Sequence, residues 1–223
     1  HKYDVVLAKV IQTIQDVNDG ELTVPSGWST PSDGGKHIVT DYEYDNLGRQ
    51  TQTLGAEHTV DIGGSAKNIR QANWMVYDDA NRETRSAQGY YDVDAETYTL
   101  VNPVSIQNRN ATGTRSESIQ ATRASTSGKL SSSDTFAQSS YVRWSVALSN
   151  DDGQRTASRV YHTIPTSGDG SSGTNYDETT FECDSLGRQN TVVSPGGTIT
   201  WNVFDRQDRA VCSYVGTNAA GDG

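Results

Sequence analysis

The chain has 223 residues, and its 18 Lys and Arg against 28 Asp and Glu give a formal net charge of −10. This charge argues against a nucleic-acid partner, because phosphate binding depends on clustered Lys and Arg side chains. Hydrophobic residues make up 33% of the chain, and no apolar run approaches the roughly 18 residues that a membrane span requires. Because 4 Trp, 11 Tyr and 3 Phe argue against disorder, we expect a folded chain with a thin core and no membrane insertion.

The predicted elements are β-strands separated by turns. In Val5–Ile14, the many β-branched side chains favour a strand over a helix. Strict alternation of apolar and polar residues in Tyr141–Leu148 and Thr198–Phe204 predicts half-buried strands, with Trp144 and Trp201 on their buried faces. The C-terminal part reads as a meander of four strands, Tyr176–Cys183, Arg188–Ser194, Thr198–Phe204 and Ala210–Val215.

Three polar stretches interrupt this pattern, at residues 22–35, 122–135 and 165–175. They are rich in Gly, Pro, Ser or Thr, which is typical of surface loops. Because strands resume after each stretch, we expect loop insertions within a single β-domain over residues 1–223.

Two tight turns can be predicted in detail. Asp45–Gly48 has Asp first and Gly fourth, as in a type I turn whose carboxylate accepts a backbone N–H. Ser194–Gly197 fits a type II turn, in which Pro195 sets its own φ and Gly196 takes a positive φ.

The first of these turns belongs to a repeated motif of an aromatic residue, Asp, two variable residues, Gly and Arg. Its copies are Tyr44, Asp45, Gly48 and Arg49; Tyr77, Asp78, Asn81 and Arg82; Cys183, Asp184, Gly187 and Arg188; and Phe204, Asp205, Asp208 and Arg209. Two looser copies have one residue inserted before Arg: Asn110, Gly113 and Arg115, and Asn150, Gly153 and Arg155. Turn positions 45, 78, 110, 150, 184 and 205 are separated by 33, 32, 40, 34 and 21 residues, and such recurrence indicates a repeat architecture.

Each residue type in the motif has a physical role. Asp holds the turn, Gly relieves its backbone strain, Arg bridges to Asp or to carbonyl groups nearby, and the aromatic ring packs across the strands. A single hairpin cannot bury its own face, whereas stacked hairpins cover one another.

The segment Cys183–Arg209 resembles the YD-repeat, or Rhs-repeat, family, and Tyr42–Gly55 is similar to the front half of the same unit. The resemblance implies antiparallel β-hairpin repeats that form a curved or spiralling sheet, as part of a larger Rhs-type shell. Relatives of this kind include bacterial polymorphic toxins and teneurins, where the shell encloses a toxic domain or serves in adhesion. By this resemblance we expect a non-enzymatic structural segment of a secreted or cell-surface protein, whose partners are neighbouring repeats of the same chain.

Two other functions stay open at this point. A carbohydrate or cell-surface binding module would use exposed aromatic side chains, and Trp28, in a loop rich in Pro, Gly and Ser, is the first candidate. A self-assembling filament would instead pair open sheet edges between copies of the chain.

The sequence predicts no catalytic and no metal site. His1, His37, His58 and His162 are far apart and are expected to be solvated, and no Gly-x-Ser-x-Gly elbow occurs. Asp92, Asp94 and Glu96 alternate as calcium ligands sometimes do, although we expect them to form the polar face of a strand. Calcium is therefore the one metal cofactor worth testing.

Cys183 and Cys212 are the two cysteines of the chain. Their spacing matches no zinc motif. They are either free thiols or one disulfide, which would require Cα atoms within roughly 7 Å of each other.

Overall fold

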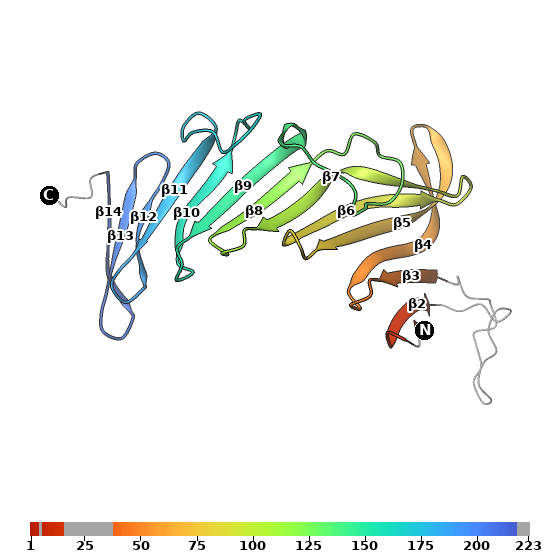
Figure 1. The fold of residues 1–223 in the computed structure, drawn as a ribbon, viewed down its shortest axis with the longest axis horizontal. Coiled ribbons are helices and arrows are strands. Elements are labelled where there is room, and N and C mark those ends of the chain that lie inside the picture. The colour runs from red at the N-terminus through yellow and green to blue at the C-terminus, as the bar shows by residue number, and fades with distance from the viewer. Residues whose placement is uncertain (5, 16–37, 218–223) are drawn as a thin grey trace. The chain divides into compact units, whose positions relative to one another are not determined.

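The computed structural model describes residues 1–4, 6–15 and 38–217. Within these ranges the single helical segment is one 3-10 turn at Gln138–Ser140, and all other regular elements are β-strands. Each strand is hydrogen-bonded to its neighbours in the chain, so the strand order runs from β1 to β14 (Figure 1). The successive strand pairs from β1 to β5 and from β8 to β14 are all antiparallel. The predicted all-β fold of antiparallel hairpins is thereby confirmed.

The chain divides into two compact units, which are described separately. Unit 1 comprises residues 1–76, 85–104 and 123–134, and unit 2 comprises residues 77–84, 105–122 and 135–223. Unit 1 contains β1 (Lys2–Asp4), β2 (Lys9–Gln15), β3 (Ile38–Tyr44), β4 (Gln50–Ile62) and parts of β5 (Ser65–Asp78), β6 (Glu83–Asp92) and β7 (Thr97–Arg109). Unit 2 contains the remaining parts of those three strands together with β8 (Arg115–Ala121), β9 (Tyr141–Ser149), β10 (Arg155–Tyr161), β11 (Tyr176–Cys183), β12 (Gln189–Val193), β13 (Ile199–Phe204) and β14 (Ala210–Gly216).

The core of unit 1 is centred on Trp74, which is 4% exposed and donates from its indole Nε1 to the buried Gln52 side chain at 2.9 Å. Gly89 on β6 lies directly against this ring. A Cβ at that position would lie 2.6 Å from two ring carbons of Trp74 and would also overlap the carbonyl oxygen of Thr99. Glycine at position 89 therefore allows the indole ring to approach the backbone closely.

The core of unit 2 lies on one face of β8–β11, which we call the inner face. The strand registers place Arg115, Glu117 and Ile119 of β8, Trp144 and Val146 of β9, Ala157, Arg159 and Tyr161 of β10, and Tyr176 and Glu178 of β11 on this face. Its apolar members are buried, with Val146 only 1% exposed. Alternation along each strand thus separates a thin apolar layer from the opposite face.

Two strand predictions differ from the structure. Residues 6–8 form a turn, so the predicted strand Val5–Ile14 is correct only from Lys9 onward. Trp201 is 45% exposed, so its predicted place in the core is wrong, although Trp144 is 6% exposed as expected. The two tryptophans occupy the same kind of alternating strand, and alternation alone does not tell which stretch is covered.

Candidate functional site

The repeated motif forms a tight turn, and its best example is Asp184 between β11 and β12. The backbone N–H of Gly187 donates to the Asp184 carbonyl at 2.9 Å, and that of Asp184 donates to the Arg188 carbonyl at 2.9 Å. The Asp184 carboxylate accepts from the backbone N–H groups of Leu186 and Arg188, both at 3.0 Å, and from Arg188 Nε at 2.8 Å. Gly187 has a φ of +82°, as expected for a type I turn followed by a bulge residue.

The same set of hydrogen bonds recurs at Asp45 and Asp205. The last copy differs in one residue, because Asp208 takes the left-handed conformation with a φ of +60° where the others have Gly. The guanidinium of Arg188 holds the pKa of Asp184 below its usual value, and the backbone N–H and guanidinium of Arg209 do the same for Asp205. The motif is therefore a self-contained hydrogen-bonded unit, as predicted from its residues.

The motif turns share a topological position. The turns at 45, 78, 110, 150, 184 and 205 each join an odd-numbered strand to the following even-numbered strand. The connections from even to odd strands vary, from the tight turn at 194–198 to the long segments at 122–140 and 162–175. This variation, together with longer strands such as β4 and β5, explains the unequal spacing of the motif.

Arg188 links one motif turn to the next. Its Nη1 donates to the carbonyl oxygen of Asp205 at 2.8 Å and to the Asp208 carboxylate at 2.9 Å. The guanidinium also lies 5.0 Å from the centre of the Phe204 ring, within cation–π range. Arg188 therefore couples the Asp184 and Asp205 turns in addition to closing its own turn.

The two looser copies keep the turn and change its polar partners. Asn110 and Asn150 accept a backbone N–H on their side-chain oxygens, from Arg115 at 3.0 Å and from Gln154 at 2.9 Å. At Asn150 the residue that closes the turn is Gln154, whose side chain pairs with the Asn150 amide at 2.7 Å. The predicted role of Arg155 in this turn is wrong, since its guanidinium lies instead over the Phe181 ring at 4.5 Å.

A second class of aspartate turn has its left-handed residue one position later. Arg82, four residues after Asp78, has a φ of +53°, and Glu96, four residues after Asp92, has a φ of +54°. In each case the carboxylate accepts the backbone N–H three residues on, from Asn81 at 3.1 Å and from Ala95 at 3.0 Å. The motif predicted Asn81 at the glycine position of the Asp78 copy. This prediction is wrong, because the left-handed residue is Arg82.

A third turn of this class lies at Asp4, where sequence analysis predicted no turn. The Asp4 carboxylate accepts from the backbone N–H groups of Val6 at 2.8 Å and Leu7 at 2.9 Å, and Ala8 has a φ of +51°. Asp4 is the only sequence signal of this turn, because the left-handed position is occupied by Ala8 and not by Gly.

The Ser194 turn also differs from its prediction. Gly197, and not Gly196, has the positive φ, at +79°. The Gly197 N–H donates to the Ser194 carbonyl, and the Ser194 N–H donates to the Thr198 carbonyl, both at 2.9 Å. This backbone pattern is that of the Asp184 turn, so the predicted type II turn is wrong and a type I turn with a bulge takes its place.

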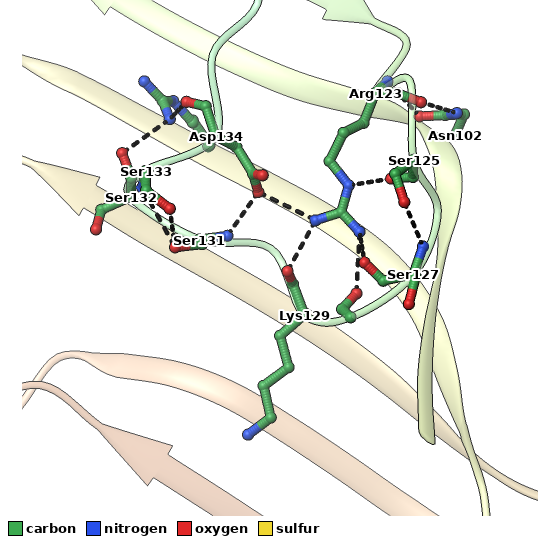
Figure 2. A network of polar contacts seen from close by, with 11 residues as sticks. Asn102, Arg123, Ser125, Ser127, Lys129, Ser131, Ser132, Ser133 and Asp134 are labelled. Carbon is green, nitrogen blue, oxygen red and sulfur yellow. Dashed lines mark hydrogen bonds and ion pairs between the residues drawn. The ribbon is translucent and has the colours of Figure 1, made fainter. Parts of the chain in front are cut away.

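The predicted loop at 122–135 is held by one arginine, and Figure 2 shows its contacts. Arg123 Nη1 reaches the Asp134 carboxylate at 3.1 Å and the Lys129 carbonyl at 2.8 Å, while its Nη2 reaches the Ser127 carbonyl at 2.7 Å. The side-chain Nδ2 of Asn102 on β7 donates to the Arg123 carbonyl, and its Oδ1 accepts from the Arg123 backbone N–H. The Arg123 guanidinium thus holds the loop together, and the Arg123 backbone attaches it to β7.

This loop also pairs with β7 through its backbone. Leu100 N–H donates to the Thr126 carbonyl at 2.7 Å, and Gly128 N–H donates to the Tyr98 carbonyl at 2.8 Å. Leu130 is 6% exposed. The loop therefore covers backbone groups along the start of β7 that would otherwise form an open strand edge.

The predicted loop at 165–175 lies on the inner face of unit 2 through Asp169. Its carboxylate accepts from Arg115 at 2.7 and 2.8 Å and from Arg159 at 2.9 Å. Each arginine also binds an acid on the sheet, Glu117 at 2.6 Å for Arg115 and Glu178 at 2.7 Å for Arg159. The Arg115 hydrogen bonds hold the pKa of Asp169 below its usual value.

An aromatic stack lies beside these charges on the inner face. The rings of Trp144 and Tyr161 are 3.9 Å apart at 14°, and Tyr176 lies 5.1 Å from Tyr161. Burial raises the pKa of Tyr161 to about 12, and nearby Asp169 adds to the shift. Within the described residues, Trp144 Nε1 and the Tyr161 hydroxyl are the buried side-chain polar atoms without a hydrogen-bond partner.

The inner face continues onto β12–β14 but is exposed there. Trp201 and Tyr214 are paired across β13 and β14, with ring centres 5.9 Å apart and exposures of 45% and 56%. Cys212 lies two residues from Tyr214 on the same face and is also exposed. Large side chains of the core type thus remain accessible on this hairpin.

The two cysteines do not form a disulfide. Cys183 lies on β11 and Cys212 on β14, with β12 and β13 between them, and both are free thiols. Three strand spacings of roughly 4.8 Å each exceed the Cα separation that a bridge permits. The disulfide that the sequence left open is therefore corrected to two free thiols.

The acidic candidates for calcium have structural roles. Asp92 is 4% exposed and forms an ion pair with Lys67 at 2.7 Å, which lowers its pKa, while residues 93–96 form a turn. The expectation that Asp92, Asp94 and Glu96 form the polar face of a strand is thus wrong. In the described ranges no group of three His, Cys, Asp or Glu is placed to hold a metal ion.

The remaining candidates are isolated residues. His1, His58 and His162 are exposed, as expected. Trp28, His37 and the predicted loop at 22–35 lie outside the described residues. No helix in the described part of the chain is long and apolar enough to cross a membrane.

No protein-family model matches the chain, and no curated protein matches it either. Among solved structures, a protein of unknown function from Bacteroides fragilis is 12% identical with a TM-score of 0.34, over 58% of this chain and 83% of that one. A porin-like protein from Bacteroides uniformis is 12% identical with a TM-score of 0.15, over 80% and 88% of the two chains.

Proposed function

We propose that the chain is a non-enzymatic structural segment of a secreted or surface-exposed YD-repeat protein, in which it serves as a scaffold or as part of an encapsulating β-shell. The proposal is supported by the Asp45, Asp184 and Asp205 turns, which use the same hydrogen bonds in the same topological position. It extends the resemblance of the motif to a protein class that works through stacked hairpins.

The observation that carries the proposal is the contact of Arg188 with the following turn. A repeat scaffold needs each unit to stabilise its neighbour, because one hairpin has too little core of its own. Arg188 meets this need with two hydrogen bonds and a ring contact to the Asp205 turn. Arg209 of the Asp205 turn is 72% exposed, and among the described residues its guanidinium bonds only to Asp205 of its own turn.

Hydrogen exchange can test this coupling with a matched pair of variants. Arg188→Lys should lower protection of the β13 amides, because lysine cannot bond both turns at once. Arg209→Lys is the control and should leave protection in β11 and β12 unchanged. Equal, purely local effects of the two variants would argue against a coupled repeat scaffold.

The proposed surface location can be tested on the protein in its native cells. Protease treatment of intact cells should remove the region recognised by an antibody against residues 38–217. Protection from protease until the cells are lysed would overturn the proposed surface location.

Carbohydrate binding is a second candidate, favoured by the exposed aromatic pair on β13 and β14. Trp201 and Tyr214 present two rings side by side, and sugars stack on such surfaces. A glycan array should then give a signal that is lost in Trp201→Ala and retained in Val160→Ala, which changes another exposed side chain. An array without any signal would remove this candidate.

A further inference from the structure

Neighbouring motif turns can contact each other through two positions. The first is the left-handed residue of a turn, and in four of the copies it is Gly48, Gly153, Gly187 or Asp208. The second is the closing residue, which we define as the residue whose backbone pairs with the Asp or Asn that begins the turn. The closing residues used below are Lys9 for Asp4, Arg115 for Asn110, Gln154 for Asn150 and Arg188 for Asp184.

Two of the glycines lie against the closing residue of the preceding turn. A Cβ on Gly48 would lie 3.3 Å from Cε of Lys9, and a Cβ on Gly187 would lie 2.8 Å from Nε2 of Gln154. Both distances are shorter than the separation at which non-bonded atoms attract each other best. Glycine at these two positions therefore has a second role besides its left-handed backbone, because it leaves room for a side chain of the neighbouring turn.

A third pair of turns has an ion pair at the same two positions. Asp208 is the left-handed residue of its turn, with a φ of +60°, where the Asp45 and Asp184 turns have Gly. Its carboxylate accepts from Nη1 of Arg188, the closing residue of the preceding turn, at 2.9 Å. Three pairs of consecutive turns thus make the same contact with three different closing side chains, Lys9, Gln154 and Arg188.

A fourth pair of turns lacks the contact, and the structure shows why. Among the described residues, nothing lies within 4 Å of a Cβ on Gly153. The closing residue of the preceding turn is Arg115, whose guanidinium is bound to Glu117 and Asp169 on the inner face. Contact at the left-handed position therefore depends on the closing side chain and is not a property of every turn.

We propose that the left-handed position of a motif turn is the docking site for the side chain that closes the preceding turn, and that its residue type selects that side chain. Glycine accepts Lys9 or Gln154 because it has no Cβ, whereas Asp208 accepts Arg188 because its carboxylate pairs with the guanidinium. This inference deepens the proposed scaffold role, and rests on it for its use in the native protein, by naming the residues through which one unit recognises the next.

The contacts are made by exposed side chains, and this determines how they must be measured. The Asp208 side chain is 74% exposed, and exposed ion pairs contribute little to the free energy of unfolding. Single substitutions therefore do not isolate the interaction between two turns. A double-mutant cycle does, because it measures how far two substitutions depart from additivity.

The first test places asparagine at two left-handed glycines. Gly187→Asn and Gly153→Asn have a similar backbone cost, because the two φ angles are +82° and +79° and Asn enters this region more readily than most residues. Only at position 187 does the new side chain meet Gln154. In urea unfolding, Gly187→Asn should raise the equilibrium constant of unfolding at least about twofold more than Gly153→Asn. Gln154→Ala should abolish this excess, because it removes the side chain that would be displaced.

Each result of the first test decides the proposal. Equal effects of the two glycine substitutions, or an excess that persists in the Gln154→Ala background, would overturn it. The hydrogen exchange of Arg188→Lys keeps this result separate from the scaffold role. If that variant lowers protection in β13 while Gln154 and Gly187 show no coupling, the scaffold role stands and the proposed docking at the left-handed position is wrong.

The second test moves one residue pair to another pair of turns. Arg188→Gln with Asp208→Gly copies the Gln154 and Gly187 pair into the Asp184 and Asp205 turns. The double variant should unfold with an equilibrium constant at least about twofold lower than the two single variants together predict. Arg188→Gln with Asp208→Asn is the control, because it loses the same ion pair but keeps a side chain at position 208, and it should depart less from additivity. Additive effects, or equal departures in the two double variants, would overturn the selection of one residue by the other.

Discussion

The inner face of unit 2 is covered over β8–β11 and open over β12–β14, although both regions are built from alternating strands and motif turns. In the covered region, Trp144 and Val146 are 6% and 1% exposed, and Asp169 of the loop at 165–175 binds to the same face. In the open region, Trp201 is 45% exposed. The turn motif occurs in both regions, so the motif does not by itself determine burial. The covered region differs in that a long loop reaches its inner face through Asp169.

The two regions therefore rely on different interactions. The covered region has a stacked aromatic layer and an ion-pair network that joins loop to sheet. The open region relies on its turns, in which Arg188 joins the Asp184 and Asp205 copies. Replacing side chains in matched pairs can separate these contributions.

The largest contrast is expected between the two tryptophans. Trp144→Ala should reduce the free energy of unfolding by about 3–5 kcal/mol, because it opens a cavity in a packed layer. Trp201→Ala should cost less than about 1 kcal/mol, as is typical of exposed positions. Urea unfolding monitored by far-ultraviolet circular dichroism gives both values, and similar costs would show that the two regions are equally covered.

A smaller effect is expected at the carboxylate that binds the loop to the sheet. Asp169→Asn should reduce the free energy of unfolding by about 1 kcal/mol, because Arg115 and Arg159 keep their partners Glu117 and Glu178. Limited proteolysis should then cut the segment at 165–175 faster. Asp208→Asn, at a side chain that is 74% exposed, is the control and should leave this cleavage rate unchanged.

A gain in stability is expected at Tyr161. Its buried hydroxyl lacks a hydrogen-bond partner, so Tyr161→Phe should raise the free energy of unfolding by up to about 1 kcal/mol. Tyr44→Phe should act in the opposite direction, because the Tyr44 hydroxyl donates to the Val10 carbonyl at 2.9 Å. Thermal unfolding of both variants tests the sign, and a loss at Tyr161 would indicate that its hydroxyl is bonded in solution.

The smallest effects are expected from pH. Arg188 and Arg115 lower the pKa values of Asp184 and Asp169, and the backbone N–H of Arg209 lowers that of Asp205, so each carboxylate stabilises the fold above its ordinary value of 3.8. This contribution is lost as the pH falls through the lowered values. The urea midpoint should therefore be level near neutral pH and fall below about pH 4. A midpoint that rises in acid would contradict the sign.

Much of the fold was predictable because its signals are local. The Asp45, Asp184 and Asp205 turns need only residues within five positions of one another, and the alternation in Tyr141–Leu148 reports which side chains share a face. Local patterns do not show which strand faces are buried by other parts of the chain. Trp144 is buried and stacks on Tyr161 of the next strand, whereas Trp201 is exposed, and the alternating pattern is the same at both. The loop contact is equally non-local, because Asp169 is 54 residues from Arg115.

The turn errors have a backbone cause. The residues at the left-handed positions of three turns are Arg82, Glu96 and Ala8. Glycine favours this conformation, and because none of the three is glycine, the sequence does not mark these turns. At Ser194–Gly197, two adjacent glycines leave the position of the positive φ undecided, and the structure places it at the second. The sequence also did not predict that Arg123 holds the loop at 122–135, because most of its partners are backbone carbonyls, which every residue has.

The restriction of the motif to odd-to-even connections has a consequence for how such a chain can change. One class of connection carries the residues that specify pairing, and the other carries the insertions at 122–140 and 162–175. Natural or engineered lengthening is therefore expected to be tolerated at the second class and to be harmful at the first. The tight turn at 194–198 is the natural place to graft a foreign loop, tag or recognition segment without disturbing the turns that hold the hairpins together.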